Sequence, residues 1–575
     1  MINGTRFKPL GKLLIEQNLI SPQQWQECLE QHRHSGKSLG KVLVDSGILT
    51  EEALLQNIAN LARMKIVDLA KAEIDKEAVD KVPASVVQVY NIMPVKLQGN
   101  NLTVAISDPL NLQFLDDLRF TLGLNIQPVV AGEDRIQEKI NQHYRVERES
   151  IPNLVSELAG KPVLPFLTKD KGGPGKFKPE GLAELAAQAP VVKLLNLIIL
   201  EAIKDKASDI HFEPFGDEFK IRYRIDGQCV EVASPPKDLN LALASRIKVM
   251  ANLDVAESRL PQDGRILTNV TGKKVDLRVS TLPTVFGESI VMRVLDKSVV
   301  SLSLDQAGLS DLDKDRLRRL IHKPNGIVLV TGPTGSGKTT SLYSCLKEIN
   351  KIDSKIITAE DPVEYDIEGI IQVNIKPKIG LSFARCLRHF LRQDPDIIMI
   401  GEIRDKETAE IAVQAALTGH LVFSTLHTND APGAITRLLD MGVAPFLLTS
   451  TLSASLAQRL VRTICPACKE RYTPDEQELS QLGLTPVQAK NKSFYRGKGC
   501  PGCKNSGYKG RIGIFELFIL DDKLRSLILE RKSAQALREA ATGAGMYSLR
   551  EDGLNKIYEG VTTIEEVASQ TQWFV

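Results

Sequence analysis

The second half of the chain repeats one pattern, in which a short apolar run is followed by a polar loop and a segment of helical periodicity. Three apolar runs predict buried strands, at residues 326–331, 355–359 and 396–400. Strands that alternate with helices are typical of a parallel α/β sheet. We therefore expect an α/β domain over residues 301–575, with mostly helical sequence over residues 516–575.

Residues 185–300 follow another pattern, which predicts a smaller α+β domain. An amphipathic helix is expected to begin at Pro190, because proline suits the first helical position. Apolar and polar residues alternate over 220–225, before a turn at Asp226-Gly227, and further strands are expected at 275–280 and 288–295. The preceding residues 146–184 are rich in glycine, proline and lysine, so we expect a linker there, with a short helix at 182–188.

Residues 1–145 are expected to form a separate N-terminal module with a tandem repeat at 9–61 and an α+β part at 62–145. The segment Leu10–Leu14 recurs 29 residues later as Leu39–Leu43. Ser21 and Thr50 occupy helix N-cap positions, so each repeat is expected to be a helix, a turn and a second helix. A strand is expected at 101–106 and a helix at 111–122, and the core is expected to include Leu13, Leu14, Leu19 and Leu43.

Composition and charge place the chain among ordinary globular proteins. It is 43% apolar and 25% charged, and 73 basic residues nearly balance 71 acidic ones, for a net charge of +2. This balance predicts no dominant attraction to nucleic acid or anionic lipid. The sequence contains no apolar run long enough for a transmembrane helix and no signal-peptide core at its N-terminus. We expect a cytoplasmic protein that reaches a membrane only through partners.

A glycine-rich loop follows the apolar run 326–331 and precedes a helix expected to begin at Leu342 and Tyr343. It fits the P-loop pattern GxxxxGK[ST], whose backbone N–H groups surround a β-phosphate. Lys338 is expected to reach the β- and γ-phosphates, and Thr339 to ligate Mg²⁺. The residues expected to bind nucleotide are Gly332, Pro333, Thr334, Gly335, Ser336, Gly337, Lys338, Thr339 and Thr340.

Acidic residues follow two of the expected strands. Residues 360–364 come after one strand and Glu402 comes after another, so both groups are expected at the ligand-binding edge of the sheet. ATP hydrolysis requires an acidic group near the metal's water shell and a group that orients the attacking water. Glu402 fits the first role and Glu364 the second, with Glu360 and Asp361 as weaker candidates for the second.

Two histidines bracket the apolar run 421–426. His420 precedes this expected strand and His427 follows it. Either histidine could sense a γ-phosphate or an attacking water, and a role as an ordinary surface or core residue is the alternative.

The cysteines fall into two groups. Cys28, Cys229, Cys345 and Cys386 are scattered and are expected to be small buried residues. Two CxxC pairs, in contrast, suit a structural zinc site with four thiolate ligands. A redox CxxC motif is the alternative, but it does not explain two copies. The expected zinc ligands are Cys465, Cys468, Cys500 and Cys503, in a subdomain at 460–515.

Taken together, the P-loop, the acidic segment 360–364, the strand ending at Glu402 and the histidines at 420 and 427 resemble the secretion superfamily of hexameric ATPases, which drive type IV pilus assembly and type II secretion. The resemblance implies a RecA-like ATPase domain, a preceding PAS-like α+β domain, an N-terminal regulatory module and a zinc insertion. ATP, Mg²⁺ and Zn²⁺ are the implied cofactors. Arg278 and Arg293 become candidate arginine fingers for the γ-phosphate.

The resemblance also implies a homohexamer that acts on an inner-membrane platform protein and docks to a cytoplasmic or membrane partner through residues 1–145. The tandem repeat resembles a motif that binds cyclic di-GMP, which makes this nucleotide a candidate ligand. The apolar skeleton of that motif is present. Its polar positions differ, since Pro9 and Ser38 stand where the motif opens with arginine, and His32 and Leu61 where it ends with glutamine.

Four functions stay open at this point. Type IV pilus assembly is favoured over type II secretion, because residues 427–432 have a pilus-like pattern, whereas residues 457–465 and 545–553 fit both systems. A motor that moves nucleic acid is a third possibility, with Arg385, Arg388 and Arg392 as its basic surface. A scaffold that binds ATP without hydrolysing it is the fourth, and the intact set of Lys338, Thr339, Glu364 and Glu402 argues against it.

Overall fold

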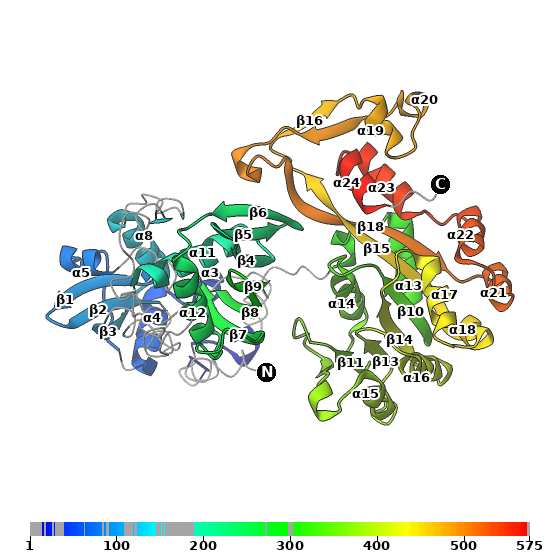
Figure 1. Ribbon diagram of the computed structural model, residues 1–575. Coiled ribbons are helices and arrows are strands. Elements are labelled where there is room, and N and C mark those ends of the chain that lie inside the picture. Colours follow the sequence, from blue (N-terminus) through cyan, green and yellow to red (C-terminus); the bar gives the residue numbers. More distant parts are fainter. Residues whose placement is uncertain are drawn as a thin grey trace. The chain divides into compact units, whose positions relative to one another are not determined.

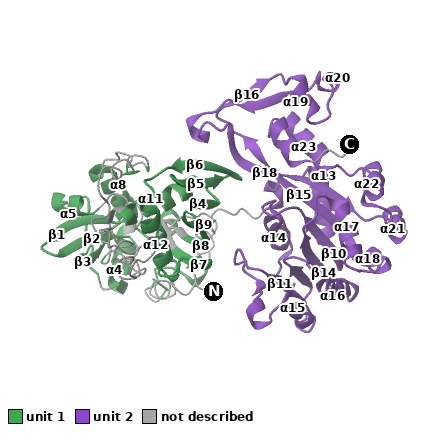
Figure 2. Ribbon diagram, in the orientation of Figure 1, with its two compact units in different colours: residues 1–299 green, residues 300–575 purple. Residues whose placement is uncertain are grey.

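The computed structural model describes residues 14–144 with gaps, residues 151, 154 and 155, residues 189–296 without 271–272, and residues 303–571. The chain forms two compact units, residues 1–299 and residues 300–575, and Figure 2 colours them separately. None of the helices that the structure describes combines the length and the apolar composition needed to cross a bilayer.

A seven-stranded sheet forms the centre of the second unit (Figure 1). Its order is β12-β11-β13-β14-β10-β15-β18, and every neighbouring pair is parallel except β15 and β18. In this order the strands are Ile370–Asn374, Ile356–Glu360, Ile397–Ile400, Leu421–Leu426, Gly326–Thr331, Leu452–Ile464 and Tyr508–Ile519. Because the first six strands are parallel, their carboxyl ends meet at one edge, where α/β sheets bind ligands.

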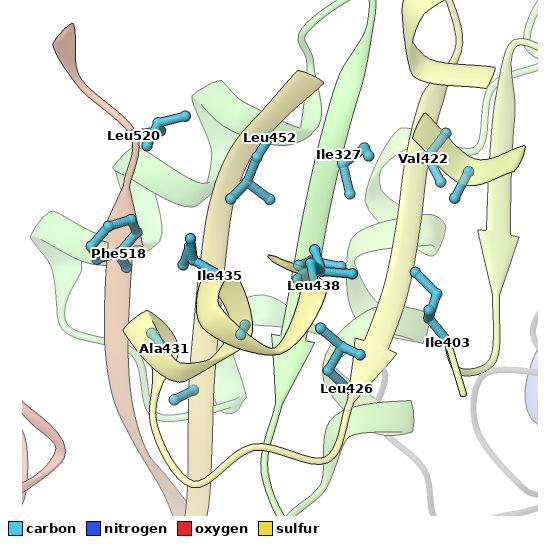
Figure 3. Packing of buried hydrophobic residues seen from close by; sticks show 14 of the residues in the cluster. Ile327, Ile403, Val422, Leu426, Ala431, Ile435, Leu438, Leu452, Phe518 and Leu520 are labelled. Carbon is cyan, nitrogen blue, oxygen red and sulfur yellow. The ribbon is translucent and has the colours of Figure 1, made fainter. Parts of the chain in front are cut away.

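Helices cover both faces of this sheet, and the apolar residues of β10 pack against the helices of both faces. Alternate side chains of a strand point to opposite faces. Val328 and Val330 pack with α13 (Asp311–Ile321) and α14 (Lys338–Ile349), whereas Ile327 and Leu329 join the core on the other face. The helices of that face are α15 (Phe383–Phe390), α16 (Lys406–Leu417), α17 (Ala431–Asp440) and α18 (Pro445–Thr451). Figure 3 shows Ala431, Ile435 and Leu438 of α17 lying against the sheet.

Strands β15 and β18 pair as a long antiparallel ribbon that continues to the paired cysteines. The insertion between them contains β16 (Lys469–Tyr472), α19 (Glu476–Ser480), α20 (Pro486–Ala489) and β17 (Phe494–Gly497). The C-terminal helices are α21 (Asp522–Leu529), α22 (Ala534–Gly543), α23 (Leu549–Tyr558) and α24 (Ile564–Gln570). The helical region therefore begins after residue 519 rather than at 516, because β18 extends the sheet to Ile519.

The first unit contains a six-stranded antiparallel sheet of order β6-β5-β4-β9-β8-β7. In this order the strands are Gln228–Ala233, Phe219–Ile225, Asp209–Pro214, Gly287–Asp296, Lys273–Thr284 and Gln262–Val270. Helices α11 (Ala189–Lys204) and α12 (Leu239–Met250) pack on it. The expected turn at Asp226-Gly227 is confirmed, since both residues have positive φ angles of 49° and 90°. The sequence analysis did not predict β7, in which no apolar alternation is evident.

Two residues of the segment expected to be a linker, 146–184, belong to a folded core instead. Ile151 and Leu154 are buried in the core of this α+β domain. Both residues are helical and lie three positions apart, a spacing that suits two side chains on one face. The short helix expected at 182–188 lies outside the described residues.

The N-terminal part has two smaller cores. A three-stranded sheet contains β1 (Met93–Gln98), β2 (Asn101–Ile106) and β3 (Asn125–Val130), with α5 (Lys76–Lys81) and α8 (Glu133–His143) beside it. The expected strand at 101–106 is confirmed. The helix expected at 111–122 falls almost wholly outside the described residues.

The second repeat forms α3 (Leu39–Asp45) and α4 (Glu51–Ala62). Thr50 Oγ1 accepts from the N–H of Ala53 and Ser21 Oγ from that of Gln24, so the two predicted N-caps are confirmed. Leu14 and Leu43 are buried as expected, but Leu19 is 37% exposed because it lies in the turn after the first helix.

Candidate functional site

The phosphate loop, residues 332–340, joins the central strand β10 to helix α14. The helix begins at Lys338, one turn earlier than the sequence analysis expected. Lys338 and Thr339 therefore lie in its first turn, where N–H groups have no partner within a helix and the helix dipole favours an anion. Thr334, Gly335, Thr339 and Thr340 are exposed, so this end of the helix is accessible to a ligand.

Two glycines of the loop lie against Gln458 of strand β15. A Cβ atom on Gly332 would come within 2.5 Å of the Gln458 carbonyl oxygen, and one on Gly337 within 2.8 Å of its Nε2. Gly337 also has a φ of +89°, which disfavours other residues. Gln458 thus supports the loop from behind, and the sequence analysis gave it no role because its function depends on the packing of β15.

Lys338 folds back over the loop in this structure. Its Nζ donates to the carbonyl oxygens of Gly332 at 2.9 Å and Pro333 at 3.0 Å. Burial lowers the pKa of Lys338, and Arg459 adds to that effect, while the negative charge of Glu402 acts in the opposite direction. These influences show that Lys338, Glu402 and Arg459 share one electrostatic environment.

Glu402 follows β13 at the carboxyl edge of the sheet, and the end of β14 fixes the chain around it. Thr425 Oγ1 donates to the Gly401 carbonyl at 2.6 Å, and the N–H of Ile403 donates to the Thr425 carbonyl at 3.0 Å. Burial opposes ionisation of Glu402, but the hydrogen bond and charge of Arg404 and the nearby His427 outweigh it and lower the pKa. Glu402 is therefore a carboxylate suited to the neighbourhood of a metal ion.

The two histidines of strand β14 lie at opposite ends of the strand. His427 Nε2 lies 3.3 Å from Glu402 Oε2, at the edge that carries the phosphate loop. His420 lies beside the first residue of β10, since its carbonyl accepts from the N–H of Gly326. Six strand residues separate them, about 20 Å of extended chain, so His420 is no part of this subunit's phosphate site. The structure does not bring His420 to the phosphate loop, because a strand that brings one end to the site carries its other end away.

The three acidic residues at and after the end of β11 lie in different environments. Glu360 is the last residue of the strand and only 3% exposed, and its carboxylate accepts a hydrogen bond from the hydroxyl of Tyr343. This burial excludes it from orienting a solvent water. Asp361 is exposed, and its charge contributes to the raised pKa of Arg404. Glu364 is partly buried, and its backbone N–H contacts Tyr343 of the phosphate-loop helix.

The phosphate loop has the features needed to bind a nucleoside triphosphate. Ser336 Oγ is buried and has no hydrogen-bond partner among the described residues, while the close approach of Gly332 leaves no room for a side chain. Thr339, one residue after Lys338, is exposed at the helix start. Together with the Glu402 carboxylate, these groups fit a magnesium-bound phosphate chain.

The two candidate arginine fingers lie in the first unit, directly opposite each other on β8 and β9. Opposed residues of an antiparallel pair share a face of the sheet. Arg293 is 58% exposed at its side chain, and its Nε donates to Asp209 Oδ1 at 3.2 Å. The pair thus presents two guanidinium groups on one face, and their role at a γ-phosphate stays a prediction.

The four paired cysteines converge at the end of the β15–β18 ribbon. Their sulfur atoms all lie within 4.8 Å of one another, with Cys465 and Cys500 at 3.9 Å and Cys468 and Cys503 at 3.8 Å. Four thiols at this separation suit a tetrahedral zinc ion. Gly499 and Gly507 have positive φ angles of 93° and 79°, as the tight turns around the ligands require. The other cysteines are buried or, for Cys229, partly buried.

Two family models match this chain. The family model described as "Type II/IV secretion system protein" matches residues 184–569, and the MshEN domain model matches residues 62–150. The type IV pilus assembly ATPase PilB of Myxococcus xanthus is 46% identical over 564 residues, which cover 98% of each chain.

Type II secretion relatives are similarly close. Type II secretion system protein E of Pseudomonas aeruginosa is 49% identical over 441 residues, 77% of this chain and 86% of the relative. The protein E of Xanthomonas campestris is 42% identical over 563 residues, 97% of each chain. Both kinds of relative therefore match most of the sequence.

Proposed function

Because the chain belongs to the type II/IV secretion system protein family, whose close relatives are named ATPases, we propose that it is a homohexameric motor that hydrolyses ATP to drive pilin polymerisation in type IV pilus assembly. The family and the RecA-like fold predicted from the motifs are confirmed. The observation that carries the proposal is the convergence of Lys338, Glu402 and His427 at the carboxyl edge of one sheet.

The proposed chemistry assigns one task to each residue. The loop N–H groups and Lys338 bind the β- and γ-phosphates, and Thr339 and Glu402 hold the magnesium, Glu402 through its water shell. Magnesium, when bound, neutralises phosphate charge. Glu364 orients the attacking water, and His427 holds the Glu402 carboxylate in place. Arg278 and Arg293 supply positive charge to the γ-phosphate.

Partners and location extend the same proposal. The motor turns an inner-membrane platform protein from the cytoplasmic side, and residues 1–145 dock a further protein. Cyclic di-GMP is the candidate regulator of this module, because the tandem repeat at 9–61 resembles a motif that binds it and the MshEN match covers the adjoining residues 62–150. Titration of the full-length protein with cyclic di-GMP in a calorimeter tests it, and absence of binding at micromolar concentrations contradicts it.

Type II secretion is the alternative function, favoured by the 49% identity to a protein E. A chromosomal Lys338→Ala allele distinguishes the two systems. Lost surface pili with normal export establish the pilus motor, whereas normal pili with enzymes trapped in the periplasm establish the secretion motor.

A further inference from the structure

A buried polar network connects the phosphate-loop helix to the acidic loop that follows strand β11. Its centre is Tyr343, which is fully buried and lies one helical turn after Thr339 on the same face of α14. The Tyr343 hydroxyl donates to one oxygen of Glu360. Burial and the charge of Glu360 raise the pKa of Tyr343, so the hydroxyl keeps its proton and remains a donor.

The Glu360 carboxylate is itself held by further hydrogen-bond donors. Its second oxygen accepts from Thr358 Oγ1 at 2.5 Å and from Gln372 Nε2 at 3.1 Å. A carboxylate that is only 3% exposed would destabilise the fold without such partners. Because these donors fix the Glu360 carboxylate, they also fix the acceptor of the Tyr343 hydroxyl.

Tyr343 in turn contacts the loop that carries Glu364. Its oxygen accepts from the backbone N–H of Glu364 at 3.4 Å, and its ring packs edge-on against Tyr365, with ring centres 6.1 Å apart. A change in the tyrosine therefore acts on the backbone of the residue that carries the water-orienting carboxylate.

The rest of the loop is held by strand β12. Gln372 accepts from the N–H of Ile367 at 2.8 Å and donates to the carbonyl of Tyr365 at 2.9 Å. Asn374 accepts from the N–H of Val363 at 2.7 Å. Side chains thus bind the loop on both sides of Glu364, while Tyr343 alone among these anchors comes from the helix that begins at the phosphate loop.

We propose that Tyr343 is a positioning residue for ATP hydrolysis, which sets the distance between Glu364 and the phosphate-loop helix. The inference rests on the proposed role of Glu364 in orienting water. Displacement of such a group by about 1 Å lowers the rate of the chemical step without loosening the phosphates. The tyrosine is fully buried and acts through Glu364.

The first test compares Tyr343→Phe with the wild type in the full-length, zinc-loaded protein. The variant keeps the ring and loses the hydroxyl. We expect kcat to fall about tenfold to a hundredfold while the Kd for a non-hydrolysable ATP analogue stays within about twofold. Ser344→Ala is the matched control, since it removes another buried hydroxyl of α14, which bonds only to Thr340 in the same helix among the contacts described. Wild-type kcat in Tyr343→Phe, or an equal loss in Ser344→Ala, overturns the proposal.

The second test shows whether the tyrosine acts through Glu364. In a Glu364→Gln background, Tyr343→Phe should leave the residual kcat unchanged, because the group that it positions is already disabled. A further fall would show an independent role and overturn the proposal. Wild-type turnover in Glu364→Gln alone would instead overturn the proposed role of Glu364, so the two failures are distinguishable.

A third variant tests the position of the loop at an exposed residue, where a substitution should not disturb folding. Asn374 is exposed, so Asn374→Ala should fold normally while releasing Val363, the neighbour of Glu364. We expect kcat to fall about twofold to fivefold with unchanged analogue binding. Unchanged kcat in this variant would contradict control of turnover by the loop position.

Discussion

Ser341 and Gln458 are joined by a buried hydrogen bond of 2.7 Å that connects helix α14 to strand β15 behind the phosphate loop. Gln458 touches the loop at two glycines, while Ser341 lies three residues after Lys338. The contact thus couples the loop's shape to the neighbouring strand. Its position suggests an effect on nucleotide binding, in contrast to the effect of Tyr343 on turnover.

Gln458→Leu should weaken ATP binding, because the loop loses its support and Ser341 is left unpaired. We expect the Kd for a non-hydrolysable analogue to rise about fivefold or more and the free energy of unfolding to fall by about 1–3 kcal/mol. Analogue titration and urea unfolding measure the two effects. In Ser341→Ala/Gln458→Leu, where both partners are removed, most of the lost stability should return; a further loss would contradict the hydrogen-bond explanation.

Zinc removal should unfold the insertion and leave the ATPase sheet intact. We expect one zinc ion per chain by elemental analysis, and its loss in Cys468→Ser, because three thiolates bind far more weakly than four. Cys386→Ser is the control, since that thiol belongs to α15 and is buried in the core. A full zinc content in Cys468→Ser would exclude the four-thiolate site.

Arg462 and Glu566 form a mostly buried ion pair between strand β15 and helix α24. Glu566 accepts from Nε and Nη2 of Arg462 and also from its backbone N–H, and the guanidinium lies 4.0 Å from the ring centre of Tyr508. Arg462→Lys loses the paired hydrogen bonds and the stacking on the ring. We therefore expect the free energy of unfolding, measured by urea titration, to fall by about 1–3 kcal/mol.

Arg496→Lys is the matched control for that variant. Arg496 pairs with Glu470 at 3.0 Å, but its side chain is 58% exposed. Exposed pairs contribute about 0–1 kcal/mol, so this change should be almost neutral. Equal losses in the two variants would show that burial does not decide the effect.

The loop before β7 should show an acid-dependent stability. Hydrogen bonds from the Arg259 side chain and backbone lower the pKa of Glu257 to about 2. Since the folded pKa is below the unfolded one, the contribution is complete above about pH 4.5 and is lost as pH falls towards 2. The stability difference between wild type and Arg259→Ala, measured by urea unfolding, should therefore shrink between about pH 5 and pH 3. A difference that grows in acid would contradict this sign.

The sequence predicted those features that depend on local pattern. The runs 326–331 and 421–426 became β10 and β14, and the spacing of the CxxC pairs anticipated four converging thiols. Features that depend on three-dimensional packing escaped it. Glu360 and Glu364 are four residues apart in one acidic segment, yet Glu360 meets Tyr343 through its buried carboxylate and Glu364 meets it through its backbone N–H.

His420 and Gln458 illustrate the same limit in opposite directions. A histidine before a strand and a histidine after it look alike in sequence, but the strand's length separates their side chains. Gln458 lies more than a hundred residues after the phosphate loop, and only the pairing of β10 with β15 brings it there.

The ribbon of β15 and β18 (Figure 1) passes the end of β10, where Ala457 pairs with Thr331. It then continues to the thiol cluster. From residue 457 to Cys465 the extended chain spans roughly 26 Å. A paired ribbon of this length behaves as a lever, so a tilt of about 5° at the nucleotide end would displace the cysteines by roughly 2 Å. The thiol cluster at the tip would thus move farther than the part of the ribbon beside the phosphate loop.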